Sequence, residues 1–85
     1  MPANLIAKRL GELLAFYSGA SEASLGPASA PQNTPGWDSA ANLNFVAAIE
    51  EEFGVTIATR DVIKLRTLGD FVTYLAARES SRARP

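Results

Sequence analysis

The residues with the clearest chemical potential are an acidic residue and a serine that stand side by side after a long glycine- and proline-containing segment. Asp38 and Ser39 follow Gly36 and Trp37 and precede an apolar helical pattern. The Asp38 carboxylate can accept hydrogen bonds from the free N–H groups of a first helical turn. The Ser39 hydroxyl would then be exposed at the positive end of the helix dipole, where a phosphate group is stabilised. The simpler interpretation is that Ser39 is only a residue type favoured at helix starts.

Two absences limit what Ser39 can do. The sequence contains no histidine and no cysteine. Without histidine, no Ser-His-Asp triad can deprotonate Ser39, and no lysine stands near it in the sequence. Without cysteine, there is no disulfide, no thiolate nucleophile and no cysteine metal site. We therefore predict no metal centre and no autonomous enzyme activity, and any reaction of Ser39 requires a base and a metal ion from another protein.

Length and hydropathy predict one small domain that does not enter a membrane. The chain has 85 residues, of which 47% are hydrophobic, and a chain of this size buries about 60% of its unfolded surface. No apolar run approaches the roughly 18 residues of a membrane span. Lys8, Arg9 and Glu12 interrupt the first apolar stretch, so no signal peptide is expected. The expected location is the cytoplasm.

The first half of the chain shows two helical patterns joined by a long loop. Residues 4–17 carry an apolar stripe, with Asn4 as the expected N-cap and Gly19 as the expected stop. Residues 18–36 hold three glycines and three prolines and are expected to form a loop that contacts the core through Leu25. Residues 38–53 form the second pattern, with a core face at Phe45, Ile49 and Phe53 and a stop at Gly54.

The second half is expected to add one short helix and one long helix. Thr59 is the expected cap of a turn over residues 60–65, with Val62 and Ile63 facing inward. Thr67 begins the last helix, with Asp70 completing a capping box. We predict an all-α bundle over residues 1–78 and a flexible tail over residues 79–85. The most buried residues are expected to be Ile6, Leu10, Leu13, Phe45, Ile49, Phe53, Ile57, Val62, Phe71 and Leu75.

The charges are balanced overall but unevenly distributed. Eight basic and nine acidic residues give a net charge of −1, which argues against a dedicated nucleic-acid binder. Residues 18–59 contain five acidic residues and no basic one (−5), whereas residues 60–85 contain six basic and three acidic residues (+3). A surface of one sign steers the encounter with an oppositely charged partner. The alternative for the run from Glu50 to Glu52 is an ordinary solvated helix face.

The motifs, taken together, resemble the acyl carrier protein family. The resemblance covers Ile6 to Ala77 in order and spacing, and each motif is weak alone. The motifs that carry it are Gly36-Trp37-Asp38-Ser39, then Glu50-Glu51-Glu52-Phe53-Gly54-Val55, and then Thr67-Leu68-Gly69-Asp70-Phe71-Val72-Thr73-Tyr74-Leu75.

This resemblance implies a four-helix carrier-protein bundle and a role for Ser39. In the family, the serine of the Asp-Ser motif receives a 4′-phosphopantetheine arm from coenzyme A, through a separate Mg²⁺-dependent phosphopantetheinyl transferase. The serine oxygen attacks the β-phosphate and leaves a phosphodiester. The thiol of the arm then carries an acyl or aminoacyl group as a thioester. By position, the attachment residue is Ser39, and Asp38 caps the helix beside it.

The resemblance also implies that partner enzymes dock on the second helix. The acidic candidates are Glu50 and Glu51, and the apolar candidates are Ala40, Leu43 and Ala47, which lie off the core stripe. The expected partners are the transferase and the acyl-loading and acyl-processing enzymes with basic docking surfaces, which meet a monomeric carrier. The alternative for Leu43 is simple packing in the core.

The sequence departs from the family pattern in ways that bear on its pathway. Ala40 stands where a bulky leucine is usual, and the first turns of this helix lack the usual acidic residues. These departures favour a carrier of a specialised pathway, such as polyketide, amino-acid-loading or glyceryl-unit synthesis. The alternatives are a housekeeping carrier of fatty-acid synthesis and, from another class, a helical interaction module that is never modified.

Overall fold

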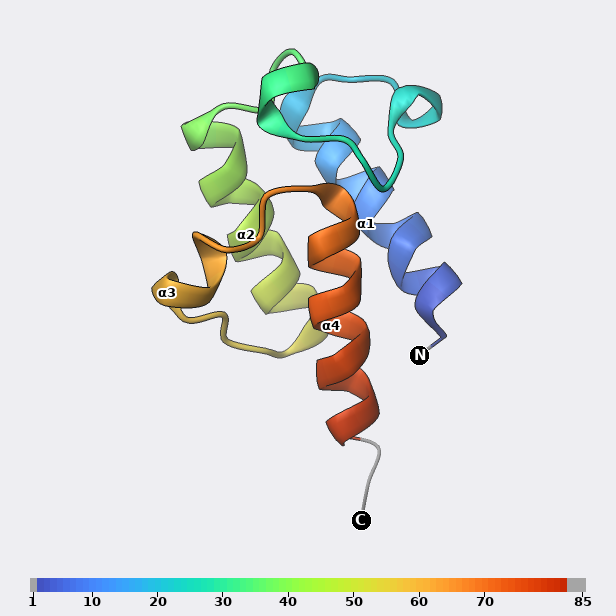
Figure 1. Ribbon diagram of the computed structural model, residues 1–85, viewed down its shortest axis with the longest axis vertical. Helices are drawn as coiled ribbons and strands as arrows, with labels where there is room; N and C mark the ends of the chain where they lie inside the picture. Colours follow the sequence, from blue (N-terminus) through green and yellow to red (C-terminus); the bar gives the residue numbers. More distant parts are fainter. Residues whose placement is uncertain (1, 83–85) are drawn as a thin grey trace.

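The computed structural model describes residues 2–82, and the regular secondary structure of that part of the chain is entirely helical (Figure 1). This confirms the predicted all-α bundle with three long helices, one short helix and a long first connection. No helix among these residues is long and apolar enough to cross a membrane. The elements are α1 (Ala3–Ser18), the 3-10 turns η1 (Glu22–Ser24) and η2 (Pro31–Asn33), α2 (Ser39–Phe53), α3 (Thr59–Val62) and α4 (Leu68–Arg82).

Helix α1 begins earlier than its sequence pattern suggested. The carbonyl oxygen of Pro2 accepts hydrogen bonds from the N–H groups of Leu5 and Ile6, both at 3.1 Å. Asn4 therefore lies inside the first turn, and its predicted role as the N-cap was wrong. The predicted stop is confirmed, because Gly19 has a φ of 78° and donates its N–H to the Ala15 carbonyl at 2.9 Å.

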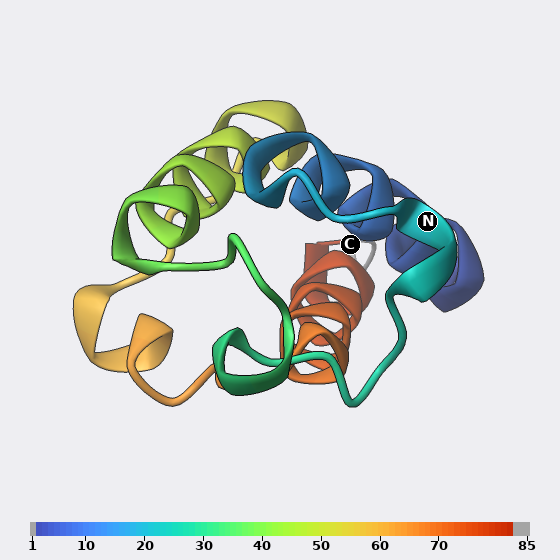
Figure 2. The ribbon, with the colours of Figure 1, turned by 90° about the horizontal axis from the view of Figure 1, so that it is seen from above.

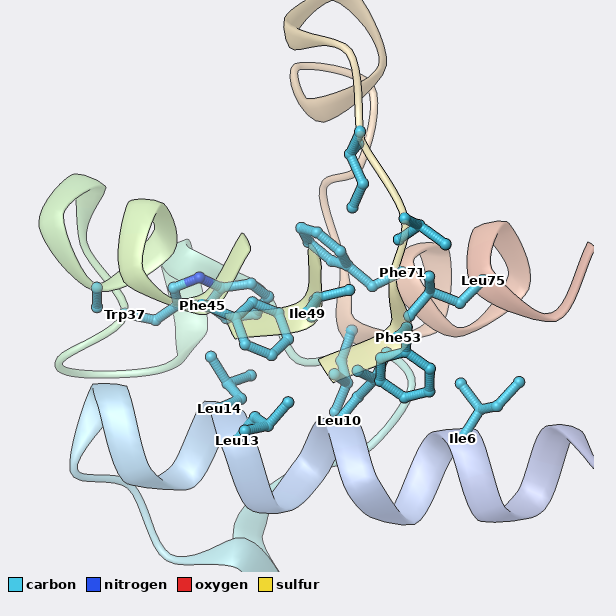
Figure 3. Close-up of a cluster of buried hydrophobic side chains, with 14 residues drawn as sticks. Ile6, Leu10, Leu13, Leu14, Trp37, Phe45, Ile49, Phe53, Phe71 and Leu75 are labelled. Atoms are coloured by element: carbon cyan, nitrogen blue, oxygen red, sulfur yellow. The ribbon is translucent and has the colours of Figure 1, made fainter. Parts of the chain in front are cut away.

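The core lies between the three long helices. Helix α1 packs against both α2 and α4, and Figure 2 shows these helices surrounding the interior while the long connection closes the remaining side. Side chains from all three helices meet in this core (Figure 3). Those with essentially no exposed surface are Phe45, Phe71, Ile6, Leu10, Leu14, Ile49 and Leu75.

The predicted core is confirmed except at Val62, which is only partly buried against it. The structure adds buried residues that the prediction did not include in the core. These are Leu14, Trp37, Ala41, Val55 and Leu68.

Three aromatic rings, those of Trp37, Phe45 and Phe71, pack against one another in the core. The Trp37 ring lies 6.0 Å from the Phe45 ring at an interplanar angle of 82°. The Phe45 and Phe71 rings are 5.1 Å apart at 65°, and the Trp37 and Phe71 rings are 6.4 Å apart. Edge-to-face pairs of this kind add about 0.5–1.5 kcal/mol each beyond the burial of their area. This cluster joins the end of the long connection to α2 and α4.

The long connection is tied to the start of α4 by backbone hydrogen bonds. The N–H groups of Leu68 and Gly69 donate to the carbonyl oxygens of Ser29 and Pro27 at 2.8 and 2.9 Å. Free N–H groups at a helix start need such partners. Leu25 packs against the core from the same connection, as predicted. The connection is therefore an ordered part of the fold that packs against the helices.

Helix α3 is shorter than expected and exposes a residue that was expected inside. Ala58 is its N-cap residue and makes no side-chain bond, so Thr59 is the first helical residue and not the cap. The helix ends at Val62, and Ile63 is 69% exposed. The inward prediction for Ile63 was therefore wrong, because the helix ends one residue before it and Ile63 points to solvent.

The start of α4 confirms the predicted capping box. The Asp70 N–H donates to Thr67 Oγ1 at 3.1 Å, and Asp70 Oδ2 accepts from the N–H groups of Thr67 and Arg66 at 3.1 and 2.9 Å. These bonds favour the ionised carboxylate and lower the pKa of Asp70. At its other end α4 extends to Arg82, so it is longer than predicted. The remainder of the expected tail, residues 83–85, lies outside the described residues.

We predict that Phe71→Ala lowers the free energy of unfolding by about 3–5 kcal/mol, because it removes a fully buried ring from the centre of the core. Phe16→Ala is the matched control, since Phe16 is 79% exposed and its loss should change stability by less than about 0.5 kcal/mol. Urea unfolding followed by circular dichroism measures both. A loss below about 1 kcal/mol for Phe71→Ala would contradict the core assignment.

Candidate functional site

The first turn of α2 holds Ser39 at the surface. Asp38 has an extended backbone, and its Oδ1 accepts a hydrogen bond from the Ala41 N–H at 2.9 Å. Asp38 is therefore the N-cap, as predicted, and Ser39 is the first helical residue. Ser39 is exposed, and none of the hydrogen bonds found among the described residues involves its hydroxyl. Attaching a group to this oxygen would therefore break none of the hydrogen bonds found among the described residues.

Trp37 fixes the chain immediately before this turn. Its side chain is only 2% exposed, and its indole N–H donates to Asn42 Oδ1 at 3.0 Å. The ring thus contacts the aromatic cluster on one side and α2 itself on the other. Sequence reasoning missed this anchor. A partial signal was present, because a large apolar residue just before an N-cap often contacts the fourth helical residue; here that residue is the polar Asn42, and the contact is a hydrogen bond.

Gly36 allows the chain to pass close to the end of α1. Its φ is 91°, in the left-handed region that favours glycine. A Cβ atom at this position would lie 1.9 Å from the Ser18 carbonyl oxygen. Only glycine fits both requirements, so this residue determines how the long connection delivers Trp37 to the core.

The outer face of α2 presents the small and apolar residues that were expected there. Ala40, Leu43 and Ala47 are all exposed, and Leu43 is exposed by 72%. The alternative that Leu43 packs in the core is thereby ruled out. An exposed leucine flanked by two alanines leaves a shallow apolar strip that begins one residue after Ser39.

The three consecutive glutamates have three different roles. The Glu50 carboxylate accepts a hydrogen bond from the Ile57 N–H at 2.8 Å and so holds the link between α2 and α3. Glu52 pairs with the Arg9 guanidinium of α1 through both carboxylate oxygens, which lowers the pKa of Glu52. Glu51 is exposed, and no ion pair to it is found among the described residues. Of the two predicted docking acids, only Glu51 has its charge directed entirely to solvent.

The arrangement supplies an accessible hydroxyl at the start of a helix. Within residues 2–82, no group of three or more acidic side chains is placed to hold a metal ion. Ser39 stands at the start of a helix of 15 residues, whose positive end stabilises a phosphate ester. The site therefore fits a residue that another enzyme modifies with a phosphate-linked group.

A comparison with known protein families supports this interpretation of the site. Residues 36–75 match the family model described as "Phosphopantetheine attachment site". The chain therefore contains the phosphopantetheine attachment domain of the carrier protein family. Such a carrier is not a catalyst, bears 4′-phosphopantetheine covalently on a serine, and meets a phosphopantetheinyl transferase and acyl-processing enzymes. In this carrier the matched segment starts at Gly36 and so includes the anchor formed by Trp37.

We predict that Gly36→Ala destabilises the carrier by at least about 3 kcal/mol, because backbone strain and an overlap with Ser18 add together. Gly19→Ala is the matched control: Gly19 also has a positive φ, of 78°, but open space around its Cβ position, so only about 1 kcal/mol is expected. Thermal and urea unfolding compare the two variants. Equal losses would show that the close approach to Ser18 is unimportant.

Proposed function

We propose that this carrier holds acyl or aminoacyl intermediates as thioesters on a 4′-phosphopantetheine arm attached to Ser39, and that it does so in a specialised, polyketide-like or other secondary-metabolite pathway. The observation that carries the assignment is that Ser39 is the only serine between residues 36 and 75, the segment that matches the family. It is also exposed at the first position of α2.

The surroundings of Ser39 suit the transfer reaction. The transferase removes the hydroxyl proton, the serine oxygen forms a bond to the β-phosphorus of coenzyme A, and the bond to the departing 3′,5′-ADP breaks. The product phosphodiester is an anion beside the positive end of α2. Asp38 Oδ1 is engaged with the Ala41 N–H. We assign Asp38 the role of holding the turn that presents Ser39.

The exposed strip of α2 is the proposed docking face for the enzymes that act on the arm. Ala40, Leu43 and Ala47 offer apolar contact, and Glu51 offers one charge that a basic partner surface can pair with. Glu50 remains a second acidic candidate, although one of its carboxylate oxygens also binds the Ile57 N–H. Exposed apolar residues next to a reactive group commonly mark an interaction site.

The preference for a specialised pathway rests on this same face. Ala40 makes it smaller next to Ser39 than the bulky residue usual in the family, and Glu51 is its only free acid among the glutamates of α2. A partner that relies on several acidic contacts would lose them here, and specificity is a difference between such affinities. A dedicated set of partner enzymes follows from this reasoning.

We expect a broad-specificity phosphopantetheinyl transferase with coenzyme A and Mg²⁺ to add the mass of one arm to the purified carrier. Ser39→Ala should abolish the addition. Ser21→Ala should not, although Ser21 is also exposed, precedes an acidic residue and stands at the start of a helical turn. Intact mass spectrometry reads both. An unmodified wild-type chain would favour the interaction-module alternative, and modification of Ser39→Ala would move the site elsewhere.

We also expect the carrier to fail to restore growth in a bacterial strain that lacks its own fatty-acid carrier. The control is the mass of the carrier recovered from that strain, which should show the arm, so that failure reflects partner recognition and not missing modification. The strain's own carrier gene is the positive control. Growth supported by this chain would favour the housekeeping alternative over the specialised pathway.

A further inference from the structure

The surface of α3 and of the turn after it is basic around an exposed apolar residue. Arg60, Ile63 and Lys64 are all exposed, and Ile63 is exposed by 69%. Arg66 follows and is exposed as well. This is the opposite sign from the acidic run of α2, and it falls within seven residues of the chain.

The fold turns the neighbouring acids away from these cations. The Asp61 carboxylate accepts a hydrogen bond from the Tyr74 hydroxyl of α4 at 3.0 Å. Tyr74 is held in turn by Arg78, which donates to its oxygen at 2.8 Å and lies 5.5 Å from the ring centre. Asp61 therefore fastens α3 to α4, and the ion pairs found among the described residues do not join it to Arg60 or Lys64.

The next acid, Asp70, is also committed to the backbone. Its carboxylate caps α4 at the N–H groups of Arg66 and Thr67, and the nearby charge of Arg66 contributes to its lowered pKa. Among the described residues, the ion pairs found do not involve Arg60 or Lys64. The free positive charge of this surface is thus concentrated at Arg60 and Lys64, on both sides of Ile63 in the sequence.

We propose that Arg60, Ile63 and Lys64 form a docking surface for a protein partner that has acidic residues around an apolar recess, with Ile63 entering the recess. Helix α3 lies on the same side of the bundle as α2, level with the later part of α2 (Figures 1 and 2). The inference rests on the proposed function in one respect, since the partner is taken to be an enzyme that acts on the arm at Ser39.

A docking region with both signs selects its partner more strictly than an acidic one. A partner with basic residues opposite Glu51 must also present acidic residues opposite α3. An enzyme with a uniformly basic docking surface would be repelled by Arg60 and Lys64, since like charges at an interface cost affinity and slow association. In this proposal, Arg60 and Lys64 of the basic segment 60–85 contribute to the choice of partner.

The test is site-specific photocrosslinking in the native host. Ile63→benzoylphenylalanine places the crosslinker in the proposed surface, and Phe16→benzoylphenylalanine places it at an equally exposed apolar position on α1, where Phe16 is 79% exposed. We expect a protein adduct from position 63 and not from position 16, with the crosslinked peptide in an acidic region of the partner. Adding Arg60→Glu and Lys64→Glu to the position-63 chain should lower the adduct yield about tenfold.

Controls separate this proposal from its alternatives. Lys8→Glu, which changes the net charge as Lys64→Glu does but on α1, should leave the adduct yield unchanged. Equal adducts from positions 63 and 16, an adduct that survives both charge reversals, or a crosslinked peptide in a basic region would overturn the proposal. So would sedimentation of the chain with phosphatidylglycerol vesicles that Lys64→Glu abolishes, because the surface would then bind anionic lipid. The mass of the same material shows the arm at Ser39 independently, so failure of the proposed function is seen separately.

Discussion

The burial of the Trp37 ring is the interaction on which the rest of the site depends. The ring packs against both Phe45 of α2 and Phe71 of α4, and its indole N–H is bound to Asn42. One side chain thus connects the end of a long, irregular connection to two helices and fixes the two peptide units that lead to Ser39. Gly36 makes this possible by passing close to the end of α1. Presentation of the hydroxyl is therefore a product of core packing, and the loop is part of the scaffold.

The second theme is that most acidic side chains near the site are used to hold the fold together. Glu50 binds the backbone of the link that follows α2, Glu52 joins α2 to α1 through Arg9, and Asp61 joins α3 to α4 through Tyr74. Hydrogen bonds to a carboxylate are stronger than those between neutral groups, so short helices and links benefit from them. Of these contacts, the ion pair between Glu52 and Arg9 also offsets charge, so the surface along α2 is less acidic than the three consecutive glutamates suggest.

Much of the fold followed from local rules, whereas the errors arose where tertiary contacts decide. The periodic apolar residues of α1, α2 and α4 and the stop at Gly54 were predictable, because helix periodicity and glycine stops are properties of short segments. The exposure of Ile63 was not predictable, because it depends on where α3 ends and how it lies against the rest of the bundle. The burial of Trp37 and the separate roles of Glu50 and Glu52 depend in the same way on residues distant in the sequence. At the site itself, the cap at Asp38 and the exposure of Ser39 were predictable because both belong to one helical turn.

The freedom of the Ser39 side chain has a consequence for how cargo is oriented. The helix holds its Cα rigidly, but no hydrogen bond among the described residues restrains its hydroxyl. The Cα–Cβ and Cβ–Oγ bonds are therefore free to rotate, and a group attached to the oxygen can point in a wide range of directions. The helix fixes the position of the Ser39 Cα atom, and it does not fix the direction of the attached group. With the arm attached at Ser39 as proposed, the direction of the cargo is set by the enzyme that binds the carrier, and the helix sets only the point from which the arm starts.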